Sequence, residues 1–262
     1  MDSLPRPTPH PDRPLLALET SGNSLGVALH ADGGVVFEEN VTEGMIHGRA
    51  LVPLMKMALA SRNLKPADLC AVAVSQGPGS WTGLRIGIAA AKAFAWAAGI
   101  PVVCVPSFEA LAIEASAVIL KRNGGEPTSS TVMTLRDARS EGFFAAIIEV
   151  TDGVPKRLLE ECVLHSADVV EAAKHCGKMA LHVCGDEKCL AQIAAEMNAN
   201  GWTPLADLKH IPARAVATCG WRRFENGTDI ARTAAEIHAL GPLYLRASDP
   251  ELKLKKVLSA EC

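Results

Sequence analysis

The sequence predicts an α/β protein of two lobes, each built from the same order of elements: three strands, a helix, a strand and a helix. Short apolar runs rich in β-branched residues alternate with helical segments in both halves of the chain. The same order occurs twice, over residues 15–98 and again over residues 131–198. A chain of 262 residues can also bury a large core without disulfide or metal staples.

The first half starts with a buried apolar strand that ends in the polar turn Glu19-Thr20-Ser21-Gly22-Asn23. Apolar residues at helical spacing predict the first helix, in which Pro53 should mark an early turn or a kink. The second helix is rich in alanine, the best helix former. The strands are expected at residues 15–18, 24–30, 35–41 and 69–75, and the helices at 46–62 and 82–98.

A short strand at 102–105 and a helix from Ser107 to Leu120 lead into the second half, with Ser107 as the expected N-cap. In that half we expect strands at 131–136, 143–150, 156–164 and 180–184, helices at 166–175 and 187–198, and a further helix at 213–225. We therefore divide the chain into a disordered proline-rich leader (1–13), a first lobe (14–106), a second lobe (107–211), a returning helix and closing segment whose lobe is left open (212–246), and a tail (247–262).

A glycine-rich turn, Ser75-Gln76-Gly77-Pro78-Gly79-Ser80-Trp81-Thr82-Gly83, joins the fourth strand to the alanine-rich helix. A helix N-terminus at such a turn presents free N–H groups and a positive dipole end, which favour a phosphate or carboxylate. No Gly-Lys-Ser/Thr follows, so the turn is not a P-loop. A tight turn without any ligand explains the pattern equally well.

The same helix carries Gly83, Gly87, Ala91, Ala95 and Gly99 at intervals of four, so one of its faces has almost no side chains. Such a face allows close approach of another backbone, either the chain's own sheet or a partner protein.

The composition excludes several classes of protein. A formal net charge of −3 argues against a broad nucleic-acid-binding surface. Eight cysteines without a C-x-x-C pair predict free thiols in a reducing cytoplasm and no zinc site. The longest apolar run, residues 86–100, is too short to span a membrane and contains Lys92. We therefore expect a soluble, cytoplasmic protein with no membrane partner.

Two such halves in tandem describe the duplicated architecture of actin, hexokinase and Hsp70-type ATPases. There an acidic turn follows the first strand of each half, and the ligand lies between the halves. Here Glu19-Thr20-Ser21-Gly22 and Asp137-Ala138-Arg139-Ser140 take those two places.

Five motifs, taken together, resemble the TsaB (YeaZ) family over residues 15–246. The most specific is the run from Gln76 to Gly87, Gln-Gly-Pro-Gly-Ser-Trp-Thr-Gly-Leu-Arg-Ile-Gly. The others are Leu18-Glu19-Thr20-Ser21, His47-x-Arg49-x-Leu51-x-Pro53, Asp137-Ala138-Arg139 and Pro242-Leu243-Tyr244-Leu245-Arg246.

The resemblance implies a non-catalytic scaffold subunit of the machinery that forms N6-threonylcarbamoyladenosine next to the tRNA anticodon. Its implied partners are a TsaD-like catalytic paralogue, a TsaE-like ATPase and, through the complex, tRNA; a homodimer is left open. The alternative is an enzyme of the same fold, a nucleotide-dependent phosphotransferase or ATPase, or a glycoprotease-like hydrolase.

The residues favour the scaffold, with no catalytic residue and no metal. The paralogue's metal site needs two histidines four residues apart, and here Leu51 stands at the second position after His47. Glu19 stands where the family's first-strand motif has Asp, which disfavours kinase-type magnesium chemistry.

Two sets of site residues follow from the resemblance and the patterns above. No cofactor is expected for the chain alone; ATP or ADP is placed at the interface with the catalytic subunit, and Arg85 could instead pair with a local carboxylate. The candidate nucleotide- or anion-binding residues are Glu19, Thr20, Ser21, Gly77, Pro78, Gly79, Ser80, Thr82, Gly83 and Arg85. The candidate partner interface, on helices that should pair with their counterparts in a helical bundle, is His47, Leu51, Leu54, Met55, Gly83, Leu84, Gly87, Ile88, Ala91 and Ala95.

Overall fold

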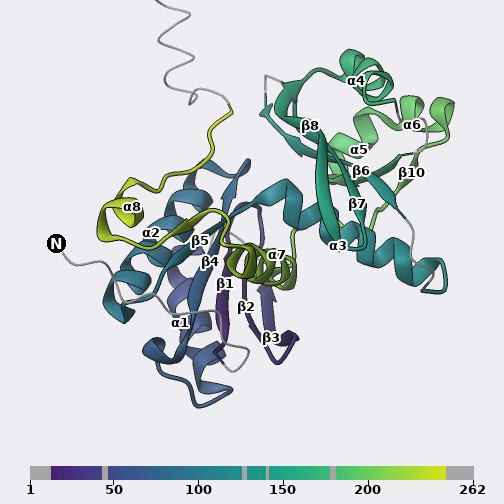
Figure 1. Cartoon of the computed structure of the whole chain (residues 1–262). Coiled ribbons are helices and arrows are strands. Elements are labelled where there is room, and N and C mark those ends of the chain that lie inside the picture. Colours follow the sequence, from purple (N-terminus) through teal and green to yellow (C-terminus); the bar gives the residue numbers. More distant parts are fainter. Residues whose placement is uncertain (1–12, 43–46, 126–128, 140–141, 178–180, 246–262) are drawn as a thin grey trace, which may run out of the picture.

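A computed structural model describes residues 13–42, 47–125, 129–139, 142–177 and 181–245 of the chain (Figure 1). The predicted disorder of the leader lies outside the described residues except at Arg13. The Arg13 guanidinium donates hydrogen bonds to the carbonyls of Ala67 and Leu69, at 2.7 and 2.8 Å. The tail at 247–262 also lies outside the described residues.

The first lobe is built on a six-stranded sheet in the order β11-β5-β4-β1-β2-β3. In it β1 pairs in parallel with β4 and antiparallel with β2. The strands are β1 (Leu15–Glu19), β2 (Leu25–Ala31), β3 (Gly34–Val41), β4 (Ala71–Gly77), β5 (Val102–Pro106) and β11 (Ile230–Ala231). The helices of this part are α1 (His47–Ala60), α2 (Trp81–Ala98) and α8 (Ala234–Ala239).

The second lobe is built on a five-stranded sheet in the order β10-β9-β6-β7-β8. Its strands are β6 (Ser130–Asp137), β7 (Phe143–Thr151), β8 (Val154–Leu164), β9 (His182–Gly185) and β10 (Thr203–Pro204). Its helices are α4 (Val169–His175), α5 (Glu187–Gln192) and α6 (Ala194–Asn200). Figure 1 shows this sheet and its helices as a body beside the first sheet.

The predicted duplication is confirmed. Strands β3-β2-β1-β4-β5 of the first sheet correspond in order to β8-β7-β6-β9-β10 of the second, and β1 pairs in parallel with β4 as β6 does with β9. The repeat extends two elements beyond the prediction, because each half adds a fifth strand, β5 or β10, and a helix after it, α3 (Ser107–Arg122) or α7 (Ala213–Asn226). These two helices pack against each other, and α7 also packs on β1 and β2.

The structure differs from the sequence-based elements where the local signal is weak. The single helix expected at 187–198 is broken at buried Ile193 into α5 and α6. Strands β10 and β11 are two residues each, too short for an alternating pattern to reveal. Helix α8 was also missed, although Thr233 and Glu236 form a capping box at its start.

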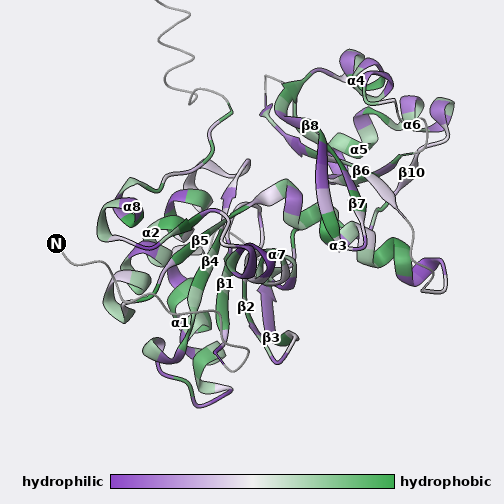
Figure 2. Cartoon of the chain, viewed as in Figure 1, coloured by the Kyte–Doolittle hydropathy of each residue, from purple (hydrophilic) through white to green (hydrophobic). Residues whose placement is uncertain are grey.

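Each face of the first sheet has its own core. Leu16 and Leu18 point toward the cluster that includes α1 and α2, whereas Leu15 and Ala17 point toward the cluster that includes α3 and α7. The second of these cores continues into the other lobe through residues such as Phe144. The central strands of the first sheet are accordingly apolar in Figure 2. Among the described helices, none combines the length and the apolarity needed to cross a bilayer.

Candidate functional site

The glycine-rich turn has the predicted strand–turn–helix geometry. Strand β4 ends at Gly77 and α2 begins at Trp81. Ser80 is the N-cap, and its Oγ accepts a hydrogen bond from the Gly83 N–H at 3.2 Å. Gly77 has a φ of 116°, a conformation that side chains rarely adopt.

This turn lies directly against the turn that follows β1. The Ser80 N–H donates to the Ser21 carbonyl at 2.7 Å. A Cβ at Gly79 would clash with the Ser21 carbonyl, and a Cβ at Gly83 would clash with that of Thr20. The glycines are therefore needed for backbone-to-backbone contact, and that contact fills the space that a ligand would need between the two turns.

Glu19, the acidic residue of the first turn, is fully buried. Its Oε1 accepts hydrogen bonds from the backbone N–H and the hydroxyl of Ser21, both at 2.6 Å. Burial raises the pKa of the Glu19 carboxyl, and the nearby Arg136 charge opposes the rise in pKa. Glu19 and Thr20 were predicted to bind an anion; both have no exposed surface in the folded chain.

Arg136, at the end of β6 in the second lobe, reaches across to this turn. Its Nη1 donates to the carbonyl of Ser21 at 2.7 Å and lies 3.2 Å from the Ser21 hydroxyl. A Cβ at Gly22 would lie 3.4 Å from both terminal nitrogens of Arg136, so the guanidinium packs directly against the glycine backbone. Sequence reasoning missed Arg136; its signal was a charged residue at the end of an otherwise apolar strand.

A cleft of about 1060 Å³ lies between the two lobes. Of the predicted anion-binding residues it is lined by Ser21, Pro78, Gly79, Ser80, Thr82 and Arg85. Gly77 and Gly83 are buried and do not line it.

Charged residues of the second lobe line the other side of this cleft. Asp137 pairs with Lys188 at 3.1 Å, and Glu187 pairs with Lys209 at 2.9 Å. The pKa of the Asp137 carboxyl is held below its ordinary value; partial burial opposes this, but the Lys188 ammonium and the Arg139 N–H outweigh it. The negative charge of the second acidic turn is therefore neutralised by a lysine of the same chain.

A segment near the end of the described chain, residues 241–245, closes over the rim of the cleft. The Leu243 N–H donates to the Gln76 carbonyl at 2.8 Å, and the Gln76 side chain donates to the Gly241 carbonyl at 3.0 Å. The Tyr244 ring stacks on Trp81, with centroids 3.9 Å apart. The Arg85 guanidinium lies 4.4 Å from the centre of the Trp81 ring and donates to the Tyr244 hydroxyl at 2.8 Å. Among the described residues, Arg85 bonds to Tyr244 and to no carboxylate, in contrast to the predicted alternative.

The small face of α2 packs on the chain's own first turn. A Cβ at Gly87 would clash with the Thr20 hydroxyl, and Ala91 and Ala95 have no exposed surface. Of the two predicted alternatives, the structure therefore has this face packed on the chain itself. The larger residues predicted for the partner interface are also buried. The residues buried within the chain are Leu51, Leu54, Met55, Gly83, Leu84, Gly87, Ile88, Ala91 and Ala95. His47 begins α1, and its side chain lies outside the described part of the chain.

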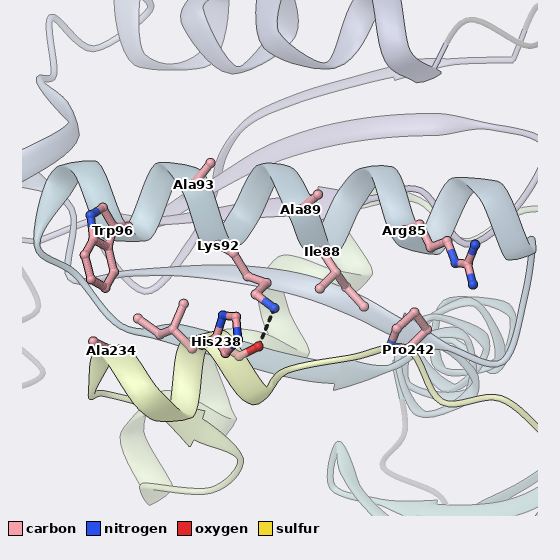
Figure 3. Close-up of a pocket in the computed structure, with 10 residues that line it drawn as sticks. Arg85, Ile88, Ala89, Lys92, Ala93, Trp96, Ala234, His238 and Pro242 are labelled. Atoms are coloured by element: carbon pink, nitrogen blue, oxygen red, sulfur yellow. Dashed lines mark hydrogen bonds between the residues drawn. The ribbon is translucent and has the colours of Figure 1, made fainter.

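The opposite face of α2 is open. Arg85, Ala89, Ala93 and Trp96 follow one another along it, and they line a groove of about 520 Å³ between α2 and α8 (Figure 3). In the middle of the groove the Lys92 ammonium donates to the His238 and Leu240 carbonyls, at 2.7 and 3.0 Å. The Trp96 side chain at its end is 63% exposed. On α1, Val52 is 53% and Met57 is 44% exposed.

Within the described residues, no three His, Cys, Asp or Glu side chains come together as a metal site would require. The seven described cysteines are free thiols. Burial raises the pKa of the Cys70 and Cys184 thiols to about 12, so these two are core residues and not nucleophiles.

Comparison with known proteins agrees with this structure. The family model described as TsaD, tRNA N6-adenosine threonylcarbamoyltransferase, matches residues 28–239. The tRNA threonylcarbamoyladenosine biosynthesis protein TsaB of Bacillus subtilis is 26% identical over 240 residues, which cover 91% of this chain and 96% of that protein. A tRNA N6-adenosine threonylcarbamoyltransferase of Sorangium cellulosum is 44% identical over 104 residues, 39% of this chain and 27% of that protein.

Two solved structures from Pseudomonas aeruginosa have the same fold. One, described as an uncharacterized protein with similarity to the peptidase YeaZ, superimposes with a TM-score of 0.70 at 23% identity and covers 89% of this chain and all of its own. The other, YeaZ, superimposes with a TM-score of 0.68 at 21% identity with the same coverage. The chain therefore belongs to the family that the TsaD model describes and, within it, to the TsaB/YeaZ group associated with tRNA threonylcarbamoyladenosine biosynthesis.

Proposed function

We propose that this chain is a non-catalytic subunit of the complex that makes N6-threonylcarbamoyladenosine in tRNA, and that it activates a TsaD-like catalytic subunit by binding to it. The observation that carries the proposal is the closed first turn. Glu19 is buried and bonded to Ser21, and the Ser21 carbonyl is taken by Ser80 and Arg136. A metal-bound nucleotide would have to break these contacts before it could reach the carboxylate.

The proposed partner surface is the open face of α2 with its neighbour α1. Ala89 and Ala93 leave room for an approaching helix, while exposed Trp96, Val52 and Met57 offer apolar side chains around them. Exposed aromatic side chains next to small residues are typical anchors of protein interfaces. The identity shared with threonylcarbamoyltransferases supports a homologous partner, because two related chains can pair through equivalent helices.

The finer parts of the proposal follow from the family resemblance. They are a TsaE-like ATPase in the same complex, tRNA bound through the complex, ATP or ADP at the interface with the catalytic subunit, and a cytoplasmic location. The same open face of α2 would serve a homodimer of the isolated chain, in competition with the catalytic subunit.

The decisive experiment measures threonylcarbamoyladenosine formation on tRNA by the cognate TsaD-like and TsaE-like proteins with and without this chain. We expect activity only with the chain present, and unchanged activity with Glu19→Gln, which keeps the buried shape of the side chain. Trp96→Ala should lower activity in a way that excess chain restores. A complex that works equally well without the chain would contradict the proposal.

The chain alone is then tested for the enzymatic alternative. We expect neither ATP hydrolysis nor peptide hydrolysis above the background of a mock purification. A metal-dependent rate that disappears in Glu19→Ala would establish an enzyme of the same fold in place of the scaffold.

A further inference from the structure

Two arginines of the second lobe connect it to the first: Arg136 directly, and Arg157 through a carboxylate of α3 that is shared with a helix covering the first sheet. Arg136 at the end of β6 is only 6% exposed, and its Nη1 donates to the carbonyl of Ser21 at 2.7 Å. That carbonyl belongs to the turn between β1 and β2, at the base of the cleft between the lobes. The Arg136 charge also acts on buried Glu19, whose carboxyl is bonded to the same Ser21.

The second crossing arginine is Arg157 of β8. Its guanidinium lies 3.1 Å from the carboxylate of Glu109, in the first turn of α3. The same carboxylate is 2.6 Å from the guanidinium of Arg223 in α7, which covers the first sheet. Only 8% of the Glu109 side chain is exposed, so one buried carboxylate joins a strand of the second lobe to a helix that packs on the first.

The Arg157 site is separate from the Arg136 site. Arg136 and Ser21 line the cleft, and Arg157, Glu109 and Arg223 do not. Arg157 is in addition held by Glu161, at 3.2 Å, whose side chain is 7% exposed. At the Arg157 site the guanidinium groups of Arg157 and Arg223 face the carboxylates of Glu109 and Glu161. At the other site Arg136 donates to Ser21, and its Nε has no hydrogen-bond partner among the described residues.

A change in the angle between the lobes would have to pull the Arg136 guanidinium off the Ser21 carbonyl and break one of the two contacts that Glu109 makes, with Arg157 or with Arg223. The acceptors would then be left without a charge-assisted hydrogen bond in a place that water reaches poorly, which is strongly unfavourable. The apolar cluster under α3 also runs from Leu15 in the first sheet to Phe144 in the second, and it would have to separate as well.

We propose that Arg136 and Arg157 latch the two lobes into one fixed body, so that the cleft between them neither opens nor closes when nucleotide is present. The outer surfaces of the two lobes would then keep a constant angle to each other. The test needs neither tRNA nor a partner protein, so its outcome is independent of the proposed function.

The test is single-molecule energy transfer between dyes on exposed sites of the two lobes. Because the chain has eight cysteines, the dyes are attached through an encoded azide amino acid at Lys56 of α1 and Glu171 of α4, both exposed. For the unaltered chain we expect one narrow distance distribution that stays the same with Mg·ATP or Mg·ADP. In the Arg136→Ala/Arg157→Ala double variant we expect a broader distribution or a second population.

Two controls separate a latch from general loss of stability. Lys209→Ala removes an exposed pair with Glu187 inside the second lobe and should leave the distribution unchanged. For Arg136→Ala, methylguanidinium added at millimolar concentration should restore the narrow distribution, because it refills the place of the missing group. If the double variant fails to fold, Arg136→Lys and Glu109→Gln give the same comparison at nearly constant volume.

Hydrogen exchange gives a second readout at the Ser80 N–H, which is bonded to the Ser21 carbonyl that Arg136 also holds. In Arg136→Ala this amide should exchange about tenfold faster or more, as expected when a charge-assisted hydrogen bond is lost next to it. A distribution that shifts with Mg·ATP in the unaltered chain would overturn the proposal. So would a double variant that behaves like the unaltered chain.

Discussion

The ring of Tyr244 stacks on the ring of Trp81, with centroids 3.9 Å apart and planes inclined by 20°. The contact ties the closing segment 241–245 to the first turn of α2, and the Arg85 guanidinium completes it by donating to the Tyr244 hydroxyl. The segment thus holds the glycine-rich turn from outside while Ser21 holds it from inside.

Tyr244→Ala should release the closing segment. Aromatic pairs contribute about 0.5–1.5 kcal/mol beyond their buried area, so we expect a loss of about 1 kcal/mol in the free energy of unfolding. The Leu243 amide, bonded to Gln76, should lose protection from hydrogen exchange. Tyr244→Phe is the matched control, because it keeps the stack and loses only the hydrogen bond from Arg85; equal effects of the two variants would contradict the role of stacking.

Gly87→Ala should destabilise the chain although alanine is the better helix former. The new Cβ would clash with the Thr20 hydroxyl beneath it. Overpacking of this kind costs about 1–3 kcal/mol, which exceeds the gain in helix propensity. Gly48→Ala in α1 is the control, since nothing lies within 4 Å of its Cβ position and it should stabilise by up to about 1 kcal/mol. Urea denaturation of both variants measures the difference, and a stabilised Gly87→Ala would show that α2 does not rest on Thr20.

Ala91→Arg and Ala93→Arg, two residues apart on α2, should have different effects: the first should lower stability and the second should weaken binding of the partner. Ala91 has no exposed surface and faces the core, so arginine there buries a charge and lowers the melting temperature strongly. Ala93 is exposed in the groove of Figure 3, so arginine there should leave the melting temperature nearly unchanged and weaken binding of the TsaD-like subunit about tenfold or more. Calorimetric titration and thermal unfolding measure the two quantities. The proposed surface would be refuted by an Ala93→Arg variant that binds normally.

His30 should make the chain less stable in mild acid. Its ring is stacked on Trp221 at 4.7 Å, and burial lowers the pKa of its imidazole below the ordinary 6.5. Below about pH 6.5 the unfolded chain takes up a proton that the folded chain does not, so the free energy of unfolding falls as the pH falls, by at most about 1.4 kcal/mol per pH unit for one histidine.

His30→Phe tests this by keeping an aromatic ring against Trp221 and removing the proton-binding group. Its stability should decline less between pH 6.5 and 5 than that of the unaltered chain, as measured by urea denaturation at each pH. His182 and His210, whose pKa values burial also lowers, act in the same direction and are present in both proteins. Parallel pH profiles would rule out a contribution from His30.

The order of the elements and the position of the glycine-rich turn could be predicted because they depend on local pattern. Apolar strands and helical spacing each depend on a few neighbouring residues. The exposed side of α2 could not be predicted. A helix face of glycine and alanine suits the chain's own backbone and a partner's equally well, and only the position of Thr20 decides between them.

The contact that Arg136 makes with Ser21 could not be predicted from the sequence for another reason. Its partner Ser21 is 115 residues away, and nothing in the neighbourhood of either residue indicates the other. The burial of Glu19 and Thr20 could not be predicted for the same reason, because the second lobe and α2 close over their turn.

The place of α7 in the chain has a consequence for synthesis. The face of the first sheet formed by Leu15 and Ala17 is covered by α7 residues such as Phe224, which follow the whole second lobe in sequence. A ribosome must therefore complete the second lobe before the residues that cover the first become available. Until then the nascent first sheet exposes an apolar face, and we expect it to be the part of the newborn chain that chaperones hold.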